Sequence, residues 1–438
     1  MPKKISIIGG GSSTFTPQLM QLFIASQVLQ GSTISLMDVD DHRLEVMDGL
    51  SRQLVARMGA DLKIESTTDR RRSLAGADFV ITAISVGGMD AWEVDIEVPA
   101  TYGIYMPIAD SVGPGGMMRA FRHIPVLADV AKDLAEVSPG AWVFNYTNPM
   151  TANCLGMLRA APVRTVGLCT CSVVPRNAGY LAQFTGGLPE EIALPAPAAG
   201  LNHCAAIIQL QLKDGRDAFP LLRQHVTQPV VKWALDNLGV LPYCWSHWTE
   251  FCPSLLRLEE PYKGRLQGLK MHYGIKVYDM EHERARARRW EDLTERLAQG
   301  GEELNLRVLP KDEAVQVVQI MEALLTGAKE VHVVNVPNYG AISNLPAQAV
   351  VEVSSLVGSY GIQPLQVAPL PEPMAATLRQ HITVQQLTVE AALAGDRRVA
   401  LQAFLHDPQI AARLTPDEAG KLLDELLRAH AGYLPTFA

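Results

Sequence analysis

The sequence predicts an α/β protein with a doubly wound parallel sheet, followed by a second domain of the α+β type. Three observations predict this class. The chain begins with an apolar strand, a glycine cluster and an amphipathic helix, and strands then alternate with helices up to about residue 195. Its 438 residues also exceed what one hydrophobic core usually serves. We therefore expect one domain at residues 1–195 and another at residues 196–438.

The elements of the first domain follow from the spacing of apolar residues. Apolar and β-branched runs predict strands at residues 4–8, 32–40, 62–68, 77–85, 141–149 and 164–169. Amphipathic patterns predict a helix that ends near residue 25 and further helices at 41–58 and 124–138. Strands that alternate with helices in this way pair in parallel, because each helix carries the chain back over the sheet.

The pattern of the second domain is looser. It predicts a strand and turn at 205–219, helices at 281–299 and 313–327, a strand and turn at 329–340, and a mostly helical end from residue 383. The arginines of 281–299 are interleaved with acids. A solvated helix face is therefore a better interpretation of this segment than a nucleic-acid patch.

The composition of the chain argues against several classes of function. The chain has 38 basic and 46 acidic residues without a long basic block, which argues against a nucleic-acid binder. Its first apolar run stops at Gly9, and no apolar run approaches the roughly 20 residues of a membrane helix. The six cysteines are scattered, unlike those of a disulfide framework. We expect a reduced, cytoplasmic protein that acts on a small molecule and binds neither nucleic acid nor a membrane.

A glycine-rich turn lies between the first strand and the first helix and consists of Gly9, Gly10, Gly11, Ser12, Ser13 and Thr14. Backbone N–H groups at such a helix start can hold a pyrophosphate, although the spacing differs from G-x-G-x-x-G. Asp38 ends the second strand, where a carboxylate accepts hydrogen bonds from a ribose diol and repels a 2′-phosphate. This order predicts a site for NAD rather than NADP. A glycine turn beside a surface aspartate is the alternative.

A second group of residues suggests a metal site. Cys169 follows a predicted strand and His203 follows a loop, and a thiolate with an imidazole suits a divalent transition metal. Asn145 and Asn148 end another strand, at the edge where ligands of doubly wound sheets gather. On local evidence alone, Cys169 as a small core residue, His203 as a structural residue and the asparagines as part of a turn before Pro149 remain alternatives.

A series of motifs runs along nearly the whole chain: IIGGGSSTFTP, LMDVD, VGG, IADSVGPGGMMRAFRHIP, YTNPM, VGLC, GLNH, VNVPNYGAISNLPAQAVVEV, AALAGDRRVALQAFLHDP and GYLPTF. Their order resembles that of family 4 glycoside hydrolases, and most closely the branch with α-galactosidases of the melibiase type. The resemblance implies a Rossmann-like NAD domain in a lactate dehydrogenase-like arrangement and a divalent metal, with manganese as the expected ion. It also implies a small carbohydrate substrate and a cytoplasmic homodimer or homotetramer.

The resemblance further implies a hydrolysis that differs from the scheme with two carboxylates. NAD takes hydride from C3 of the sugar, a base removes the acidified proton on C2, the C1 substituent is eliminated, water adds, and the hydride returns. The metal, chelated by O2 and O3, stabilises the enediolate. The expected substrates are unphosphorylated α-hexosides or α-uronides. An oxidoreductase that releases a 3-keto sugar and a binding protein without activity are the alternatives.

Individual positions match the motifs of the family. Cys169 and His203 match the metal ligands, and Asn148 matches a residue between the sugar and the cofactor. Gly87 lies in the VGG motif, which we assign to the cofactor site, and Asp110 stands where the family has a substrate contact.

One stretch departs from the family. Most members have a histidine or another polar group after the metal cysteine, whereas this chain has Thr170 and then Cys171. A threonine cannot act as a general acid near neutral pH, and a cysteine is a poor one. We place Thr170 among the substrate contacts and Cys171 among the catalytic candidates. Tyr243 is the first candidate for the C2 base and His247 is the second.

Overall fold

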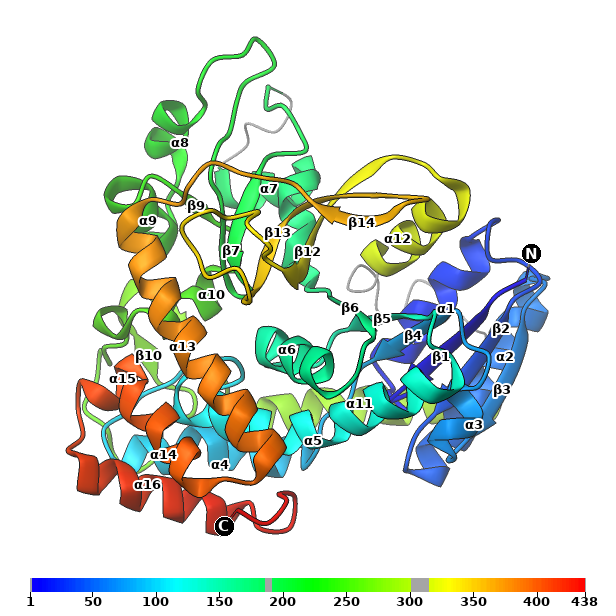
Figure 1. Ribbon diagram of the computed structural model, residues 1–438, viewed down its shortest axis with the longest axis horizontal. Helices are drawn as coiled ribbons and strands as arrows, with labels where there is room; N and C mark the ends of the chain where they lie inside the picture. Colours follow the sequence, from blue (N-terminus) through cyan, green and yellow to red (C-terminus); the bar gives the residue numbers. More distant parts are fainter. Residues whose placement is uncertain (1, 186–190, 301–314, 438) are drawn as a thin grey trace.

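One large sheet organises the fold (Figure 1). The computed structural model describes residues 2–185, 191–300 and 315–437. Within these residues the sheet has 12 strands, in the order β3-β2-β1-β4-β5-β6-β12-β13-β7-β8-β9, with β14 paired to β13. Two short strands, β10 (Lys270–Met271) and β11 (Ile275–Lys276), form a separate pair.

The first part of the sheet is parallel and doubly wound, as predicted. Its strands are β1 (Lys4–Ile8), β2 (Thr33–Met37), β3 (Lys63–Thr67), β4 (Phe79–Thr82), β5 (Trp142–Asn145) and β6 (Arg164–Gly167). The order places β1 beside β4, at the point where the winding direction reverses. Ligands of such sheets bind outside the carboxyl ends of the strands at this point. The glycine turn after β1 therefore lies at the expected place.

Helices cover both faces of the parallel strands (Figure 1). The helices of this half of the chain are α1 (Phe15–Ala25), α2 (Asp41–Met58), α3 (Arg70–Leu74), α4 (Gly88–Thr101), α5 (Gly113–Val137), α6 (Met150–Ala160) and α7 (Ala178–Thr185). Among them, α2, α3 and α6 contact the parallel strands, whereas α4 packs on α5. The prediction for α2 is confirmed at both ends, because Asp40 accepts a hydrogen bond from the Arg43 N–H and Gly59 ends the helix in the left-handed conformation.

The sequence did not predict α4 or the first turns of α5. Those turns are rich in glycine because the backbone packs closely there: a Cβ on Gly115 would lie 2.6 Å from the carbonyl oxygen of Asp95. A Cβ on Gly116 would lie 2.5 Å from the carbonyl carbon of Ser111. Glycines that are required for close packing contribute nothing to an amphipathic pattern, so the sequence pattern did not predict the start of α5.

The second part of the sheet is antiparallel. Its strands are β7 (Ala198–Leu201), β8 (Cys204–Ile207), β9 (Leu241–Pro242), β12 (Glu330–Pro337), β13 (Val350–Gly358) and β14 (Gly361–Pro364). β12 joins the parallel part by pairing Asn335 with Gly167 of β6. β13 was not predicted, because it is buried along almost its whole length and lacks alternation. One sheet thus spans both predicted domains, and the boundary at residue 195 stays a prediction.

Helices of the second half pack against the first half: α13 contacts α5 and α6, and α11 contacts α2. The α-helices after residue 196 are α8 (Phe219–His225), α9 (Pro229–Asn237), α10 (Trp245–Trp248), α11 (Met280–Ala298), α12 (Val315–Thr326), α13 (Glu372–Ala394), α14 (Arg397–His406), α15 (Pro408–Ala411) and α16 (Pro416–Ala429). Short 3-10 turns are η1 (Thr170–Arg176), η2 (Thr249–Phe251), η3 (Pro253–Leu255) and η4 (His272–Gly274). In the described part of the chain, none of the helices combines the length and apolar character needed to cross a bilayer.

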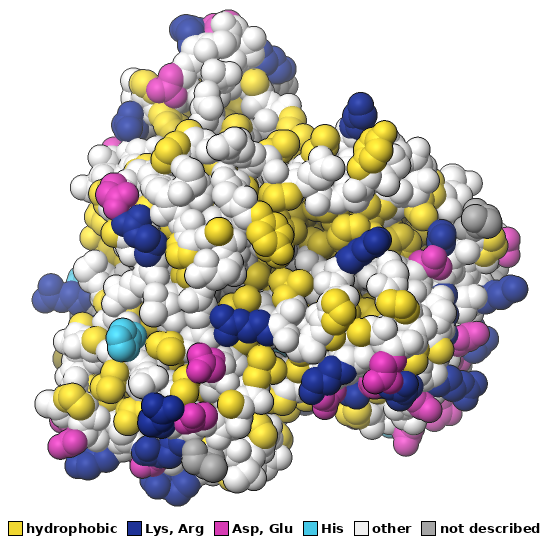
Figure 2. All heavy atoms as spheres, viewed as in Figure 1, with side chains coloured by type: hydrophobic (Ala, Val, Ile, Leu, Met, Phe, Trp, Pro, Cys, Tyr) yellow, Lys and Arg dark blue, Asp and Glu magenta, His cyan; other side chains and the backbone are white. Residues whose placement is uncertain are grey.

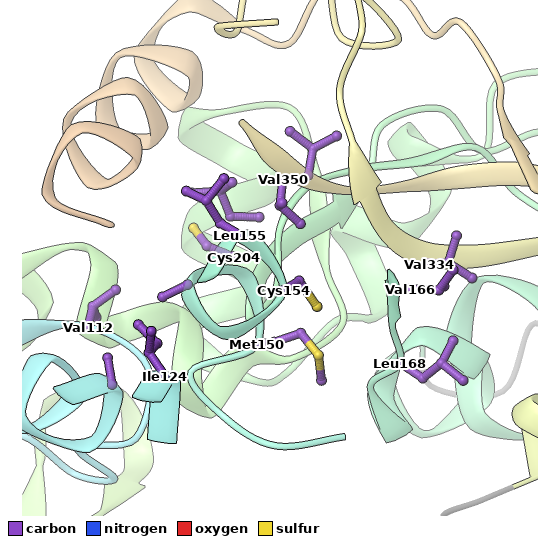
Figure 3. Packing of buried hydrophobic residues seen from close by; sticks show 14 of the residues in the cluster. Val112, Ile124, Met150, Cys154, Leu155, Val166, Leu168, Cys204, Val334 and Val350 are labelled. Atoms are coloured by element: carbon purple, nitrogen blue, oxygen red, sulfur yellow. The ribbon is translucent and has the colours of Figure 1, made fainter. Parts of the chain in front are cut away.

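The apolar helix α6 lies in the main core (Figure 3). Met150, Cys154 and Leu155 of this helix are buried and belong to the same cluster as Ile124 of α5 and Val334 of β12. The face seen in Figure 2 is hollowed near its centre, where hydrophobic side chains gather. Because α6 is held from several sides, the loop that precedes it is also fixed relative to the sheet.

Candidate active site

The glycine turn after β1 brings the backbone close to neighbouring strands. Gly9 has a φ of 97°, and a Cβ at this position would lie 2.2 Å from the carbonyl oxygen of Ala83. A Cβ on Gly10 would lie 3.0 Å from the Cα of Leu36. The N–H groups of both glycines donate to the carbonyl oxygen of Met37. Close packing therefore requires these glycines, and the turn leads into the start of α1, where an anion can bind.

Asp38 lies beside this turn, directly after β2. Its carboxylate accepts a hydrogen bond from the Gly11 N–H at 2.9 Å, and the residue is half-buried. A Cβ on Gly11 would lie 2.9 Å from the same carboxylate oxygen. Ser12, Ser13 and Thr14 follow and are also half-buried. An accessible carboxylate next to a glycine turn is the arrangement that binds the ribose of NAD.

The loop after β4 carries Gly87, which begins α4 with a φ of 81°. A Cβ on Gly87 would lie 2.5 Å from that of Ala91, so a side chain does not fit. The N–H of Val86 donates to Nε2 of His123, and Nδ1 of His123 donates to the carbonyl oxygen of Asn148 at 2.7 Å. Burial lowers the pKa of His123 well below its ordinary value, in keeping with a neutral ring. His123 thus links the Gly87 loop to Asn148.

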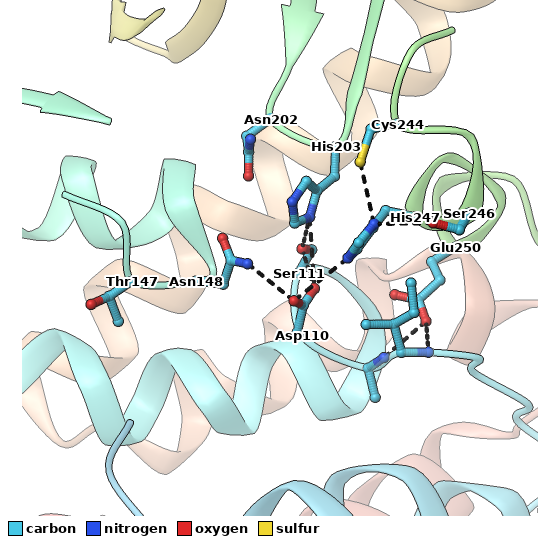
Figure 4. A network of polar contacts seen from close by, with 12 residues as sticks. Asp110, Ser111, Thr147, Asn148, Asn202, His203, Cys244, Ser246, His247 and Glu250 are labelled. Carbon is cyan, nitrogen blue, oxygen red and sulfur yellow. Dashed lines mark hydrogen bonds and ion pairs between the residues drawn. The ribbon is translucent and has the colours of Figure 1, made fainter. Parts of the chain in front are cut away.

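Asn148 and Asp110 face each other across the site (Figure 4). Nδ2 of Asn148 donates to Oδ2 of Asp110 at 3.0 Å. Within the described residues, Oδ1 of Asn148 is buried without a hydrogen-bond partner. A buried amide oxygen needs a donor. A hydroxyl group of a sugar or of a ribose could supply it, as expected for a residue between substrate and cofactor.

His203 lies in the turn between β7 and β8 with a φ of 68°. Its Nδ1 is 2.6 Å from the hydroxyl oxygen of Ser111, and Ser111 donates to Oδ1 of Asp110 at 2.6 Å. Because the single hydroxyl proton of Ser111 goes to Asp110, the hydroxyl oxygen accepts from the His203 Nδ1–H. This tautomer has a lone pair on Nε2, which is the state in which a histidine binds a metal.

The ring of His247 packs against that of His203, with centroids 3.8 Å apart. Nδ1 of His247 is 3.3 Å from Sγ of Cys244, and Nε2 is 3.7 Å from Oδ2 of Asp110. Asp110 therefore faces both histidines. Burial alone raises the pKa of the Asp110 carboxyl, but His247 and His203 outweigh burial and hold this pKa well below its ordinary value.

The donor set fits a divalent metal. Ligand atoms of His203, Cys244 and His247 lie within 4.8 Å of one another. The Cys169 thiol follows β6 and lies close enough to His203 and Cys244 to interact electrostatically with both. All six cysteines are free, so these thiols are available as ligands. The structure thus brings the predicted pair, Cys169 and His203, together and adds another thiol and another imidazole.

Thr170 and Cys171 begin η1, directly after Cys169. Thr170 is exposed and Cys171 is half-buried. Hydrogen bonds from the thiols of Cys169 and Cys244 lower the pKa of Cys171 well below its ordinary value. The catalytic role of Cys171 stays a prediction.

Tyr243 takes part in a different polar cluster, around the buried Glu352 of β13. The Tyr243 and Ser172 hydroxyls donate to Oε1 of Glu352 at 2.5 and 3.1 Å. The side-chain amides of Asn202 and Asn335 donate to Oε2 at 2.8 and 2.9 Å. Burial, and then Glu352, raise the pKa of Tyr243 well above its ordinary value. These surroundings oppose the ionised form that a tyrosine base requires.

Comparisons with known proteins decide the family. The model of the family 4 glycosyl hydrolases matches residues 4–178, and the model of their C-terminal domain matches residues 198–410. An alpha-galactosidase of Bacillus subtilis (strain 168) is 31% identical over 451 residues, which cover 99% of this chain and 100% of that protein. The chain is a family 4 glycoside hydrolase.

Two further comparisons give a second type of relative and a solved structure with the same fold as this family 4 hydrolase. An alpha-galacturonidase of Lachnoclostridium phytofermentans is 28% identical over 467 residues, which cover 99% of this chain and 97% of that protein. The structure of a 6-phospho-alpha-glucosidase from gut microorganisms, in complex with NAD and Mn²⁺, has a TM-score of 0.81 and 20% identity and covers 100% of both chains. The predicted family and the predicted fold class are confirmed.

The fold of this family 4 hydrolase assembles much of what the sequence suggested. Asp110, Asn148, Cys169, His203 and His247 come together, whereas Tyr243 belongs to the Glu352 cluster. Three polar residues of the site were not among the predicted site residues: Ser111, Glu250 and Glu352. Ser111 is adjacent in sequence to the predicted Asp110, whereas the two glutamates had no local signal.

Glu250 holds the loop that carries Asp110. Its Oε1 accepts hydrogen bonds from the N–H groups of Ile108 and Ala109 at 2.7 and 2.8 Å. Among the described residues, its Oε2 is buried without a partner. Burial, and then the negative charge of Asp110, raise the pKa of Glu250 to about 8. Glu250 thereby connects the Asp110 loop to the segment that contains Cys244 and His247.

Proposed function

We propose that this enzyme hydrolyses α-glycosides of unphosphorylated hexoses or hexuronic acids by oxidation at C3, elimination at C1, addition of water and reduction. The observation that carries the proposal is the convergence of Asn148, Asp110 and His203 at the carboxyl edge of the sheet that also holds the glycine turn. The alpha-galactosidase and alpha-galacturonidase relatives support the two classes of sugar.

The glycine turn at 9–14, Asp38 and Gly87 would hold NAD, and Cys169 with His203 would hold a divalent metal such as Mn²⁺. When bound, these groups supply a hydride acceptor and a positive charge for the oxygens of the oxidised sugar. The similar structure in complex with NAD and Mn²⁺ supports this assignment. We further propose that the enzyme works in the cytoplasm as a homodimer or homotetramer, and its six free thiols suit a reducing compartment.

The side chains of the site divide the remaining tasks. Asn148 and Asp110 would position hydroxyl groups of the sugar, because the Asn148 side-chain oxygen has no donor among the described residues. His247 is the favoured C2 base, because its imidazole lies in the site beside Cys244 and Asp110, and an imidazole can accept a proton near neutral pH. Tyr243 is the weaker candidate, because it donates to Glu352. Thr170 would contact the substrate without donating a proton.

A screen of aryl α-glycosides, supplied with NAD, Mn²⁺ and a thiol reductant, tests the proposal. We expect release of the chromophore to require NAD and to occur without net formation of NADH. In deuterated water, the product should carry deuterium at C2, and His247→Gln should lose this exchange while Tyr243→Phe retains it. Net formation of NADH with a keto sugar would instead identify an oxidoreductase, and release without NAD would contradict the proposed chemistry.

Asp38 provides a separate test of the cofactor. Asp38→Ala should weaken the binding of NAD about 10-fold or more, because a hydrogen bond to a charged group contributes roughly 1.5–3 kcal/mol. The wild-type enzyme should prefer NAD to NADP, and the variant should lose part of this preference. Titration of both cofactors by fluorescence measures the effect, and equal affinities in the wild type would refute the role of Asp38.

A further inference from the structure

Three of the six thiols gather at the active site. Cys171 lies close enough to Cys169 and Cys244, and Cys169 close enough to His203, for these side chains to influence one another electrostatically. Cys244 comes from the loop before α10, far from the other two in sequence. If Cys169 and His203 were the only metal ligands, the site would not need another thiol. The presence of Cys244 beside them therefore requires an explanation.

The positions of the donors single out Cys244. The ligand atoms of Cys244 and His203 lie within 4.8 Å of each other. Cys169 is near enough to interact electrostatically with both residues. Asp110 and Ser111 orient His203 through Nδ1, the support that metal-binding histidines commonly receive from a carboxylate. The other member of the group, His247, has partners on both nitrogens: Cys244 at Nδ1 and Asp110 at Nε2.

We propose that Cys244 is a third protein ligand of the metal, so that Cys169, Cys244 and His203 form a Cys₂His site. This inference rests on the proposed function, because it concerns the metal of the same site. Three protein ligands leave a position for a sugar oxygen, as catalytic metal sites do. His247 then stays beside the metal site, with Nδ1 next to the Cys244 sulfur and Nε2 next to Asp110.

A site with two thiolates and one imidazole should prefer some metals over others. Thiolates are soft ligands that bind zinc and cobalt much better than manganese, which prefers oxygen. Cys244 should therefore increase the affinity for Co²⁺ and Zn²⁺ more than the affinity for Mn²⁺. Removal of the Cys244 thiol should shift the preference of the site toward Mn²⁺.

The test titrates the full-length protein with Co²⁺ and separately with Mn²⁺, without NAD or sugar. Thiolate bonds to Co²⁺ give a charge-transfer band in the near ultraviolet. In Cys244→Ser the intensity of this band should fall. The affinity for Co²⁺ should fall by at least about 10-fold, which is the loss commonly seen when a residue that only supports a metal ligand is replaced. The affinity for Mn²⁺ should change less. Cys252→Ser is the matched control, because Cys252 is half-buried and lies outside the thiol cluster formed by Cys169, Cys171 and Cys244. This substitution should change neither the band nor the affinity.

A measurement on the unaltered protein guards against misfolding of the variant. Zn²⁺ should protect both Cys169 and Cys244 from alkylation by iodoacetamide, as counted by mass spectrometry of peptides. Equal alkylation of Cys244 with and without Zn²⁺ would overturn the inference. So would a Co²⁺ band that disappears in Cys169→Ser and is unchanged in Cys244→Ser. That second result leaves the proposed function intact, since NAD-dependent release of the aglycone with Mn²⁺ is measured separately.

Discussion

Two buried carboxylates near the thiol cluster, Asp110 and Glu352, have opposite surroundings. Asp110 faces the imidazoles of His203 and His247, which hold its pKa well below the ordinary value despite burial. Glu352 is surrounded by neutral donors from two hydroxyls and two amides, and burial followed by Cys169 raises its pKa.

The difference indicates that Asp110 acts as a charged group in the chemistry of the site, whereas Glu352 has a structural role. The partners of Asp110 can change their protonation or bind a metal, so Asp110 influences chemistry through them. The partners of Glu352 come from η1, the β7–β8 turn, β9 and its following loop, and β12, and Glu352 ties these segments together. Loss of the first carboxylate should therefore reduce activity, and loss of the second should reduce stability.

The largest effect is expected for the two predicted metal ligands. Cys169→Ser and His203→Ala should lower metal content and reduce turnover by more than about 100-fold, because even outer partners of metal ligands contribute about 10- to 100-fold. Elemental analysis and circular dichroism check that metal is lost while the fold is kept. A variant with full metal-dependent activity would remove its residue from the metal site.

Asp110→Asn should come next. The amide keeps the size of the side chain but loses the negative charge behind both histidines, so we expect metal affinity or activity to fall about 10- to 100-fold. The free energy of unfolding should change little by comparison. Metal titration and denaturant unfolding of the same preparation measure both quantities. A variant that unfolds early and binds metal normally would reverse the roles assigned to the two carboxylates.

Glu352→Gln should show the opposite pattern. One oxygen becomes an NH₂ group that faces other donors, so we expect a loss of about 1–3 kcal/mol in the free energy of unfolding. Turnover per folded molecule should fall less than in Asp110→Asn. Denaturant unfolding followed by circular dichroism tests this, and a variant of normal stability with little activity would show that Glu352 has a direct catalytic role.

The smallest effect on activity is expected for Glu250, and its signature is a pH dependence of stability. The pKa of Glu250 rises from 4.5 to about 8 on folding, so between these values the folded chain holds a proton that the unfolded chain releases. Its contribution to stability is present below about pH 4.5 and is lost as the pH rises toward 8. Glu250→Gln keeps an acceptor for Ile108 and Ala109, so its stability relative to the wild type should increase with pH across this window. A constant difference would contradict the raised pKa.

Local patterns predicted the parallel part of the fold well. The strands near residues 4, 33 and 63 and the helix at 41–58 are continuous stretches whose periodicity and caps lie in neighbouring residues. β13 and α4 escaped prediction because burial or glycine content removes the periodic signal. The resemblance to the family supplied the metal pair, which local evidence alone had left open.

The sequence by itself determined the family, the parallel doubly wound class of the first part of the sheet and the glycine turn with its acid, because each is written in contiguous residues. Only the tertiary structure decided which side chains share the site. His203 and His247 meet at 3.8 Å between ring centroids, and Cys244 reaches Cys169, because the β7–β8 turn and the loop before α10 fold over the carboxyl ends of β5 and β6. Tyr243, only four residues before His247, is drawn instead to Glu352. Such choices depend on distances between segments far apart in the chain, and no local pattern carries that information.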